Sequence, residues 1–179
     1  MLILMNSAHL HLILNHIPVL GTWFGLLLLL AAGVLRKSEE LKRAALVTFV
    51  LTALVTIPTY LAGQAAEDMV ERLPGVSEQL IEGHEGAGLV ALIAASALGA
   101  LALGGLILFR RAENLPKRFV ALSLIVSLGV AGWMVWTANL GGKVRHTEIR
   151  GEGLTESPAD EEGDEDRGGR GRGRGRSDR

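Results

Sequence analysis

The amino-acid sequence predicts an all-α integral membrane protein, built as an up-down bundle of four helices. Three observations predict this class. Hydrophobic residues make up 49% of the 179 residues, aromatic residues make up only 4%, and the apolar residues are concentrated in four long runs. A span needs about 20 largely apolar residues to cross the hydrocarbon core of a bilayer, and an ordinary soluble enzyme cannot bury four such runs. Each run must satisfy its own backbone polar groups, so each is expected to be a helix.

The four expected spans are joined by polar connections. The spans cover about residues 9–35, 41–66, 84–109 and 119–140. The first run has no basic segment before it and is too long for the apolar part of a signal peptide, so we interpret it as a span. Pro18 and Pro58 fall inside spans and are expected to kink them or to mark a local break.

Small residues predict how the helices pack. Ala87, Ala91, Ala95 and Gly99 recur at every fourth position of the third span, a spacing that lets helix backbones approach closely. The short first and third connections predict that the spans they join are antiparallel neighbours. We therefore expect residues 1–150 to form one transmembrane domain.

The remaining segment, residues 151–179, is rich in Gly and acidic residues and then in Arg-Gly repeats. It has almost no apolar side chains, so we expect a disordered tail. Placed outside the cell membrane, its Arg-Gly repeats would meet no nucleic acid.

The charges of the connections predict the orientation. The acidic second connection carries a single basic residue, Arg72. Basic connections stay on the cytoplasmic side, so both termini and the second connection are expected on the periplasmic face of a bacterial inner membrane. Trp133 and Trp136 lie near the outer end of the fourth span, where indole rings favour the interface. The basic residues of the first and third connections are Arg36, Lys37, Lys42, Arg43, Arg110, Arg111, Lys117 and Arg118.

The positions of the histidines are the main indication of function. In the expected topology all five lie at the outer ends of spans: His9, His11, His16, His84 and His146. Ionisable residues in or near a span are costly and indicate a functional site. Cysteine is absent, which excludes thiolate metal sites and covalently attached c-type haem.

Three interpretations of these histidines stay open. The first is non-covalent b-type haem, with iron held by His16 and His84 or by His11 and His84, and with His9 and His146 as alternative ligands or ligands of a second centre. The second is a copper or zinc site, for a binding or transport-accessory protein, that uses the same five histidines. The third is a structural subunit of a larger membrane complex, whose histidines bind no cofactor.

Polar residues near the same ends are candidates for orienting the imidazoles through their second ring nitrogen. Glycines beside them are expected to leave room for a flat macrocycle, and Arg145 or Lys143 is expected to pair with haem propionates. The candidate orienting residues are Asn15, Gln64, Glu67, Asp68, Glu85 and Asn139.

Four segments resemble an uncharacterised family of bacterial four-helix membrane proteins, a domain of unknown function. The segments are HLHLILNHIPVLG at 9–21, IPTYLAG at 57–63, HE at 84–85 and ANLGGKVRH at 138–146. The resemblance covers about residues 5–150, and the tail has no counterpart. It implies the four-helix fold and a cofactor-binding membrane subunit near respiratory or c-type cytochrome components.

From these observations we expect a small b-type haem electron-transfer subunit that is not an enzyme on its own. Its expected partners are the lipid bilayer and a periplasmic cytochrome or the subunits of a respiratory complex. Homo-oligomerisation stays open.

Overall fold

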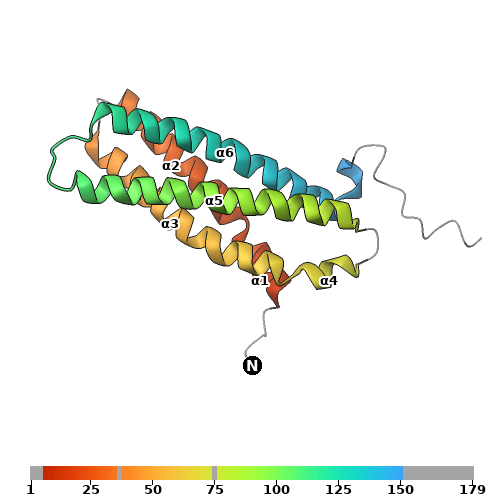
Figure 1. The fold of residues 1–179 in the computed structure, drawn as a ribbon. Coiled ribbons are helices and arrows are strands. Elements are labelled where there is room, and N and C mark those ends of the chain that lie inside the picture. Colours follow the sequence, from red (N-terminus) through yellow and green to blue (C-terminus); the bar gives the residue numbers. More distant parts are fainter. Residues whose placement is uncertain (1–5, 36–37, 74–75, 151–179) are drawn as a thin grey trace, which may run out of the picture.

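A computed structural model describes residues 6–35, 38–73 and 76–150. The described chain is helical and has no strand, so the expected all-α class is confirmed. The predicted disordered tail, 151–179, lies outside the described residues. Figure 1 shows the long helices side by side along one axis. The helices are α1 Ser7–Leu14, α2 His16–Val34, α3 Glu39–Gln64, α4 Glu67–Glu71, α5 Glu78–Leu108 and α6 Lys117–Arg145, followed by the 3-10 turn η1 Thr147–Ile149.

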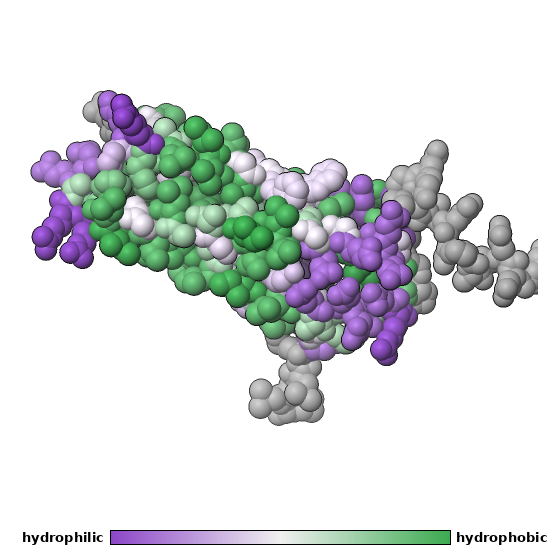
Figure 2. Space-filling view, viewed as in Figure 1, coloured by the Kyte–Doolittle hydropathy of each residue, from purple (hydrophilic) through white to green (hydrophobic). Residues whose placement is uncertain are grey.

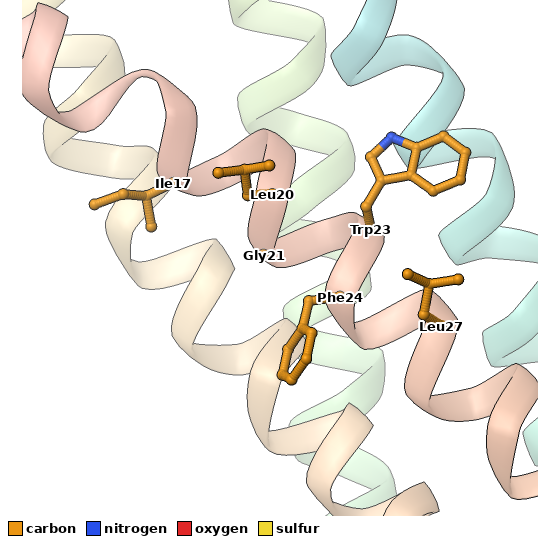
Figure 3. Close-up of a pocket in the computed structure, with 6 residues that line it drawn as sticks. All are labelled: Ile17, Leu20, Gly21, Trp23, Phe24 and Leu27. Atoms are coloured by element: carbon orange, nitrogen blue, oxygen red, sulfur yellow. The ribbon is translucent and has the colours of Figure 1, made fainter.

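Four helical segments are long and apolar enough to cross a membrane: α1 with α2, then α3, α5 and α6. Apolar side chains cover the middle of the bundle, and polar side chains gather at its two ends (Figure 2). The protein is therefore a multi-pass membrane protein. The expected antiparallel pairs, α2 with α3 and α5 with α6, are both in contact, and α3 and α5 pack together most extensively.

Two helices extend beyond the spans predicted from hydropathy. Helix α5 begins at Glu78 rather than at residue 84, and α6 continues to Arg145 rather than ending at residue 140. Hydropathy locates the apolar part of a helix, whereas a helix continues through polar residues as long as its backbone hydrogen bonds are made. The short helix α4 in the second connection was not predicted, because its five residues, EDMVE, lack an apolar run.

The first span is interrupted at Asn15, which separates α1 from α2. Pro18 follows three residues later and has no N–H to donate to the carbonyl of Leu14, the last residue of α1. The proline ring also crowds that carbonyl, so the interruption falls where the sequence predicted one. By contrast, α3 continues through Pro58 without a break.

Helix α1 is fastened to the end of α3. The Asn6 side chain caps α1 by accepting a hydrogen bond from the His9 N–H at 2.8 Å. The Ser7 hydroxyl donates to the carbonyl of Ala65 at 2.7 Å. These contacts hold the first turn of α1 close to α3, at what we call the histidine end of the bundle: α1, α4, the start of α5 and the end of α6 (Figure 1).

The predicted small-residue face of α5 is buried. Ala87, Ala91, Ala95 and Gly99 are all buried, as the sequence predicted. A Cβ atom on Gly99 would lie 2.4 Å from the Cβ of Ala53 on α3, closer than two carbon atoms can approach. Glycine is thus required here for α3 and α5 to pack at their observed distance.

At the opposite end, the first hairpin binds the loop of the second. Arg43 Nη2 donates to the carbonyls of Phe109 at 3.2 Å and Ala112 at 2.8 Å. The Leu115 N–H donates to Glu39 Oε2 at 2.9 Å, and Glu39 also forms an ion pair with Lys42. These bonds join the start of α3 to the loop that follows α5, so they fix the two hairpins to one another.

Candidate cofactor site

Two of the five histidines meet at the histidine end. The ring centroids of His11 and His84 are 6.3 Å apart, and the ring planes make an angle of 79°. His11 comes from α1 and His84 from α5, and both side chains are half-buried. Residues far apart in the sequence are therefore brought together as a T-shaped pair of rings.

His11 is held by α3. Its Nδ1 atom lies 2.9 Å from the main-chain carbonyl oxygen of Thr59. The ring lies against Gly63, one turn further along α3: a Cβ atom there would be 2.9 Å from Nδ1 and 3.0 Å from Cε1. The backbone of α3 thus supplies both the hydrogen-bond acceptor and the space for the ring.

His84 is held by α6 in the same way. Its Nδ1 atom lies 3.1 Å from the carbonyl oxygen of Thr137. A Cβ atom on Gly141 would lie 2.8 Å from the His84 Cε1 atom. The Trp133 indole and the Thr137 hydroxyl both donate to the carbonyl of Ala87, at 3.0 and 3.3 Å, and so fasten this part of α6 to α5.

These two hydrogen bonds decide the protonation pattern of the pair. A main-chain carbonyl accepts but never donates, so Nδ1 must carry the proton in each ring. In a neutral imidazole the lone pair is then on Nε2, which is the usual arrangement of a histidine that ligates a metal. Both His11 and His84 therefore present a ligating nitrogen that their Nδ1 bonds leave uncommitted.

The other three histidines are not part of this pair. His9 and His16 are exposed, and His146 is exposed with its Nδ1 atom 2.9 Å from Glu148 Oε1. Within the described residues, no three or more His, Cys, Asp or Glu side chains are grouped so that they could hold a metal ion. The shared five-histidine site considered from the sequence is thus not assembled in this structure.

The Nδ1 atoms of His11 and His84 bond to main-chain carbonyls rather than to the polar residues expected to orient the imidazoles. Gln64 Nε2 donates instead to Glu85 Oε1 at 2.5 Å. Glu67 lies near Glu85, whose negative charge is the main cause that raises the pKa of Glu67 above its ordinary value. The Oδ1 atom of Asn15 is buried and has no hydrogen-bond partner among the described residues. Asp68, Asn139 and Arg145 are exposed, and Lys143 is half-buried.

The sequence does not predict which groups orient the imidazoles. They are the carbonyls of Thr59 and Thr137, and every residue type has a carbonyl. Glycines near the histidines were expected to leave room for a flat macrocycle. In the structure, the space beside Gly63 and Gly141 is occupied by an imidazole. A usable sequence pattern does exist: Thr-x-x-x-Gly occurs near the end of α3 and again near the end of α6.

The donor set suits some groups better than others. Two imidazoles with uncommitted Nε2 atoms fit a metal with two axial sites, as in a haem with two histidine ligands. They are too few for zinc, which takes four ligands in structural sites and three protein ligands in catalytic sites. Comparisons with protein-family models, curated proteins and solved structures found no match. The assignment of function therefore depends on this geometry.

Proposed function

We propose that this protein is a b-type haem electron-transfer subunit, in which His11 and His84 would hold the haem iron. The observation that carries the proposal is the close T-shaped pair of imidazoles, with each Nδ1 atom bonded to a main-chain carbonyl. Of the two ligand pairs open from the sequence, this geometry favours His11 with His84, because His16 is exposed.

The separation of the rings supports this choice. A bond between a metal and an imidazole nitrogen is about 2.0 Å long, so two such bonds in line place the ring centroids roughly 6 Å apart. The observed centroid separation is 6.3 Å. This agreement in centroid separation supports the proposal that both imidazoles bind one metal ion.

The protein's own residues have three tasks in this proposal. The carbonyls of Thr59 and Thr137 hold the tautomer and raise the basicity of Nε2. Gly63 and Gly141 let each imidazole lie directly on a helix backbone. The surrounding helices half-bury both rings. A bound haem would supply one-electron chemistry.

The proposal places the histidine end on the periplasmic side of a bacterial inner membrane, with both termini outside. Its support is the excess of Lys and Arg in the first and third connections, since basic connections stay in the cytoplasm. The proposed partners are a reduced quinone in the bilayer and a soluble cytochrome or respiratory subunit at the outer face.

A visible absorption spectrum of the full-length protein tests the proposal. The protein is expressed with ample haem, purified in detergent, and measured oxidised and then reduced with dithionite. We expect a Soret band that shifts on reduction, with sharp α and β bands. A featureless spectrum from folded protein would overturn the haem proposal. Metal analysis would then distinguish copper binding from a purely structural subunit.

Histidine variants locate the site. We expect His11→Ala and His84→Ala to lose the Soret band, because each removes one axial ligand. The matched controls are His9→Ala, His16→Ala and His146→Ala, whose side chains are exposed, and we expect them to keep it. Circular dichroism checks that every variant is helical. If both His11→Ala and His84→Ala retain full haem, the assignment of this pair is wrong.

A further inference from the structure

The two histidines are held by arrangements of the same kind. In each, an imidazole Nδ1 atom bonds to the carbonyl of a threonine, and the ring lies on the glycine four residues later. The pair Thr59 and Gly63 does this on α3, and the pair Thr137 and Gly141 does it on α6. Two such matches in a short chain indicate that the site has two equivalent halves.

The chain around them has the same order in both halves. A histidine-bearing segment is followed by a basic loop and then by the helix that carries Thr-x-x-x-Gly. The loop sequences also correspond: RKSEELKR at 36–43 and RRAENLPKR at 110–118 share Arg, Glu, Leu, Lys and Arg in the same order. The first hairpin, α1 to α3, is thus the counterpart of the second, α5 to α6. Parallel repeats of this kind are known in membrane proteins, where binding sites lie between the two halves.

The glycines are the positions where this arrangement would fail most easily. A methyl group at Gly63 or Gly141 would come within 3 Å of ring atoms of His11 or His84, respectively. The ring would have to move, and its Nδ1 bond would lengthen or break. Two other glycines of the bundle have no such neighbour: a Cβ atom on Gly86 of α5 or on Gly132 of α6 would meet nothing within 4 Å.

We propose that Gly63 and Gly141 are equivalent positioning residues in two repeated hairpins, each of which fixes the ring plane of its own histidine. This inference deepens the proposed function and rests on it for the identity of the metal group. Because each half sets its own ring, the observed angle of 79° between the rings follows from how the hairpins pack.

The first test needs no haem and no variant. Protein labelled with nitrogen-15 histidine is prepared without haem, and its imidazole signals are recorded by NMR at a pH where the rings are neutral. We expect His11 and His84 to be locked with the proton on Nδ1; the exposed His146, whose Nδ1 atom lies 2.9 Å from Glu148 Oε1, is expected to share this tautomer and is assigned separately. If His11 and His84 both carry the proton on Nε2, the proposal is overturned.

The second test uses four variants in the same measurement. We expect Gly63→Ala to abolish the locked signal of His11 and leave that of His84, and Gly141→Ala to do the reverse. Gly86→Ala and Gly132→Ala are the matched controls and should leave both signals unchanged. If Gly63→Ala and Gly141→Ala both fold, as judged by circular dichroism, and leave both histidine signals at their wild-type positions, the two glycines have no positioning role.

Electron paramagnetic resonance of the haem-loaded protein gives the ring angle. The principal g values of a low-spin ferric iron depend on the angle between its axial ring planes, so we expect the wild-type spectrum to indicate perpendicular planes. Gly63→Ala and Gly141→Ala should each shift the largest g value, whereas Gly86→Ala and Gly132→Ala should not. Parallel planes in the wild type would contradict the inference. A protein that shows the NMR pattern but binds no haem would refute the proposed function. The positioning role of Gly63 and Gly141 would then still hold.

Discussion

Ser123 is a fully buried side chain of α6 whose hydroxyl has no hydrogen-bond partner among the described residues. An unsatisfied buried hydroxyl costs roughly 1–3 kcal/mol. Ser123→Ala removes that atom and changes the volume very little, so we expect the free energy of unfolding to stay equal or to rise by about 1 kcal/mol. Denaturant unfolding in detergent micelles measures this free energy of unfolding.

The matched control for this change is Ser127→Ala, one turn further along α6. Ser127 is also fully buried, but its hydroxyl donates to the carbonyl of Leu124 at 3.0 Å. We therefore expect Ser127→Ala to be the less favourable of the two. A larger loss of stability in Ser123→Ala would mean that the hydroxyl has a partner, such as a buried water.

Glu67 on α4 makes stability depend on pH. The carboxylate of Glu85 is the main cause that raises the pKa of Glu67, and Glu71, Asp68 and Glu82 add to it. An acid with a raised pKa binds its proton more tightly in the folded state than in the unfolded state. Its ionisation therefore destabilises the fold at neutral pH, and this penalty is relieved as the pH falls through the raised pKa.

We expect this group to raise the melting temperature as the pH falls from neutral towards the ordinary carboxyl pKa value of 4.5. We expect Glu67→Gln to be more stable than the wild type at neutral pH and to show a flatter profile. Glu40→Gln, an exposed change at the start of α3, should leave the profile unchanged. A Glu67→Gln protein with the wild-type profile would show that the acidic residues around α4 do not repel one another.

At the scale of the element, the break between α1 and α2 decides which histidine enters the site. His11 precedes the break, on α1, and contacts the Thr59 carbonyl of α3, whereas His16 begins α2 and is exposed. We expect Pro18→Ala to restore a donor for the Leu14 carbonyl and join the two helices. A continuous helix would carry His11 away from the Thr59 carbonyl, so haem content should fall.

The absorbance ratio of the Soret band to the protein band measures that loss. Pro116→Ala is the control, because Pro116 precedes α6 at the opposite end of the bundle. A Pro18→Ala protein with full haem would mean that α1 is positioned by the Ser7 and His11 contacts alone.

The same break limits what the sequence can reveal. Apolar runs predict the four spans, because crossing a bilayer requires length and hydropathy that few other structures share. The gathering of candidate histidines near helix ends was also predictable. The choice between His11 and His16 was not, because helical periodicity assigns faces only within an unbroken helix. Nor could the orienting groups be predicted, since the Thr59 and Thr137 carbonyls are backbone atoms.

At the scale of the whole molecule, the two ends of the bundle differ in charge. The end opposite the histidines carries Arg43, Arg110, Arg111, Lys117 and Arg118, whereas α4 contributes Glu67, Asp68 and Glu71 to the histidine end. Positive connections remain in the cytoplasm, so this asymmetry predicts that α4 and the histidine pair face the periplasm.

Single-cysteine labelling tests this orientation without background, because the sequence contains no cysteine. Glu71→Cys and Glu113→Cys place one thiol at each end, both at exposed positions. In intact spheroplasts, a membrane-impermeant maleimide should label Glu71→Cys and should reach Glu113→Cys only after the membrane is permeabilised. The reverse pattern would place the histidine pair on the cytoplasmic side. A periplasmic redox partner would then be excluded, while the haem proposal would stand, because the ligand geometry is the same in either orientation.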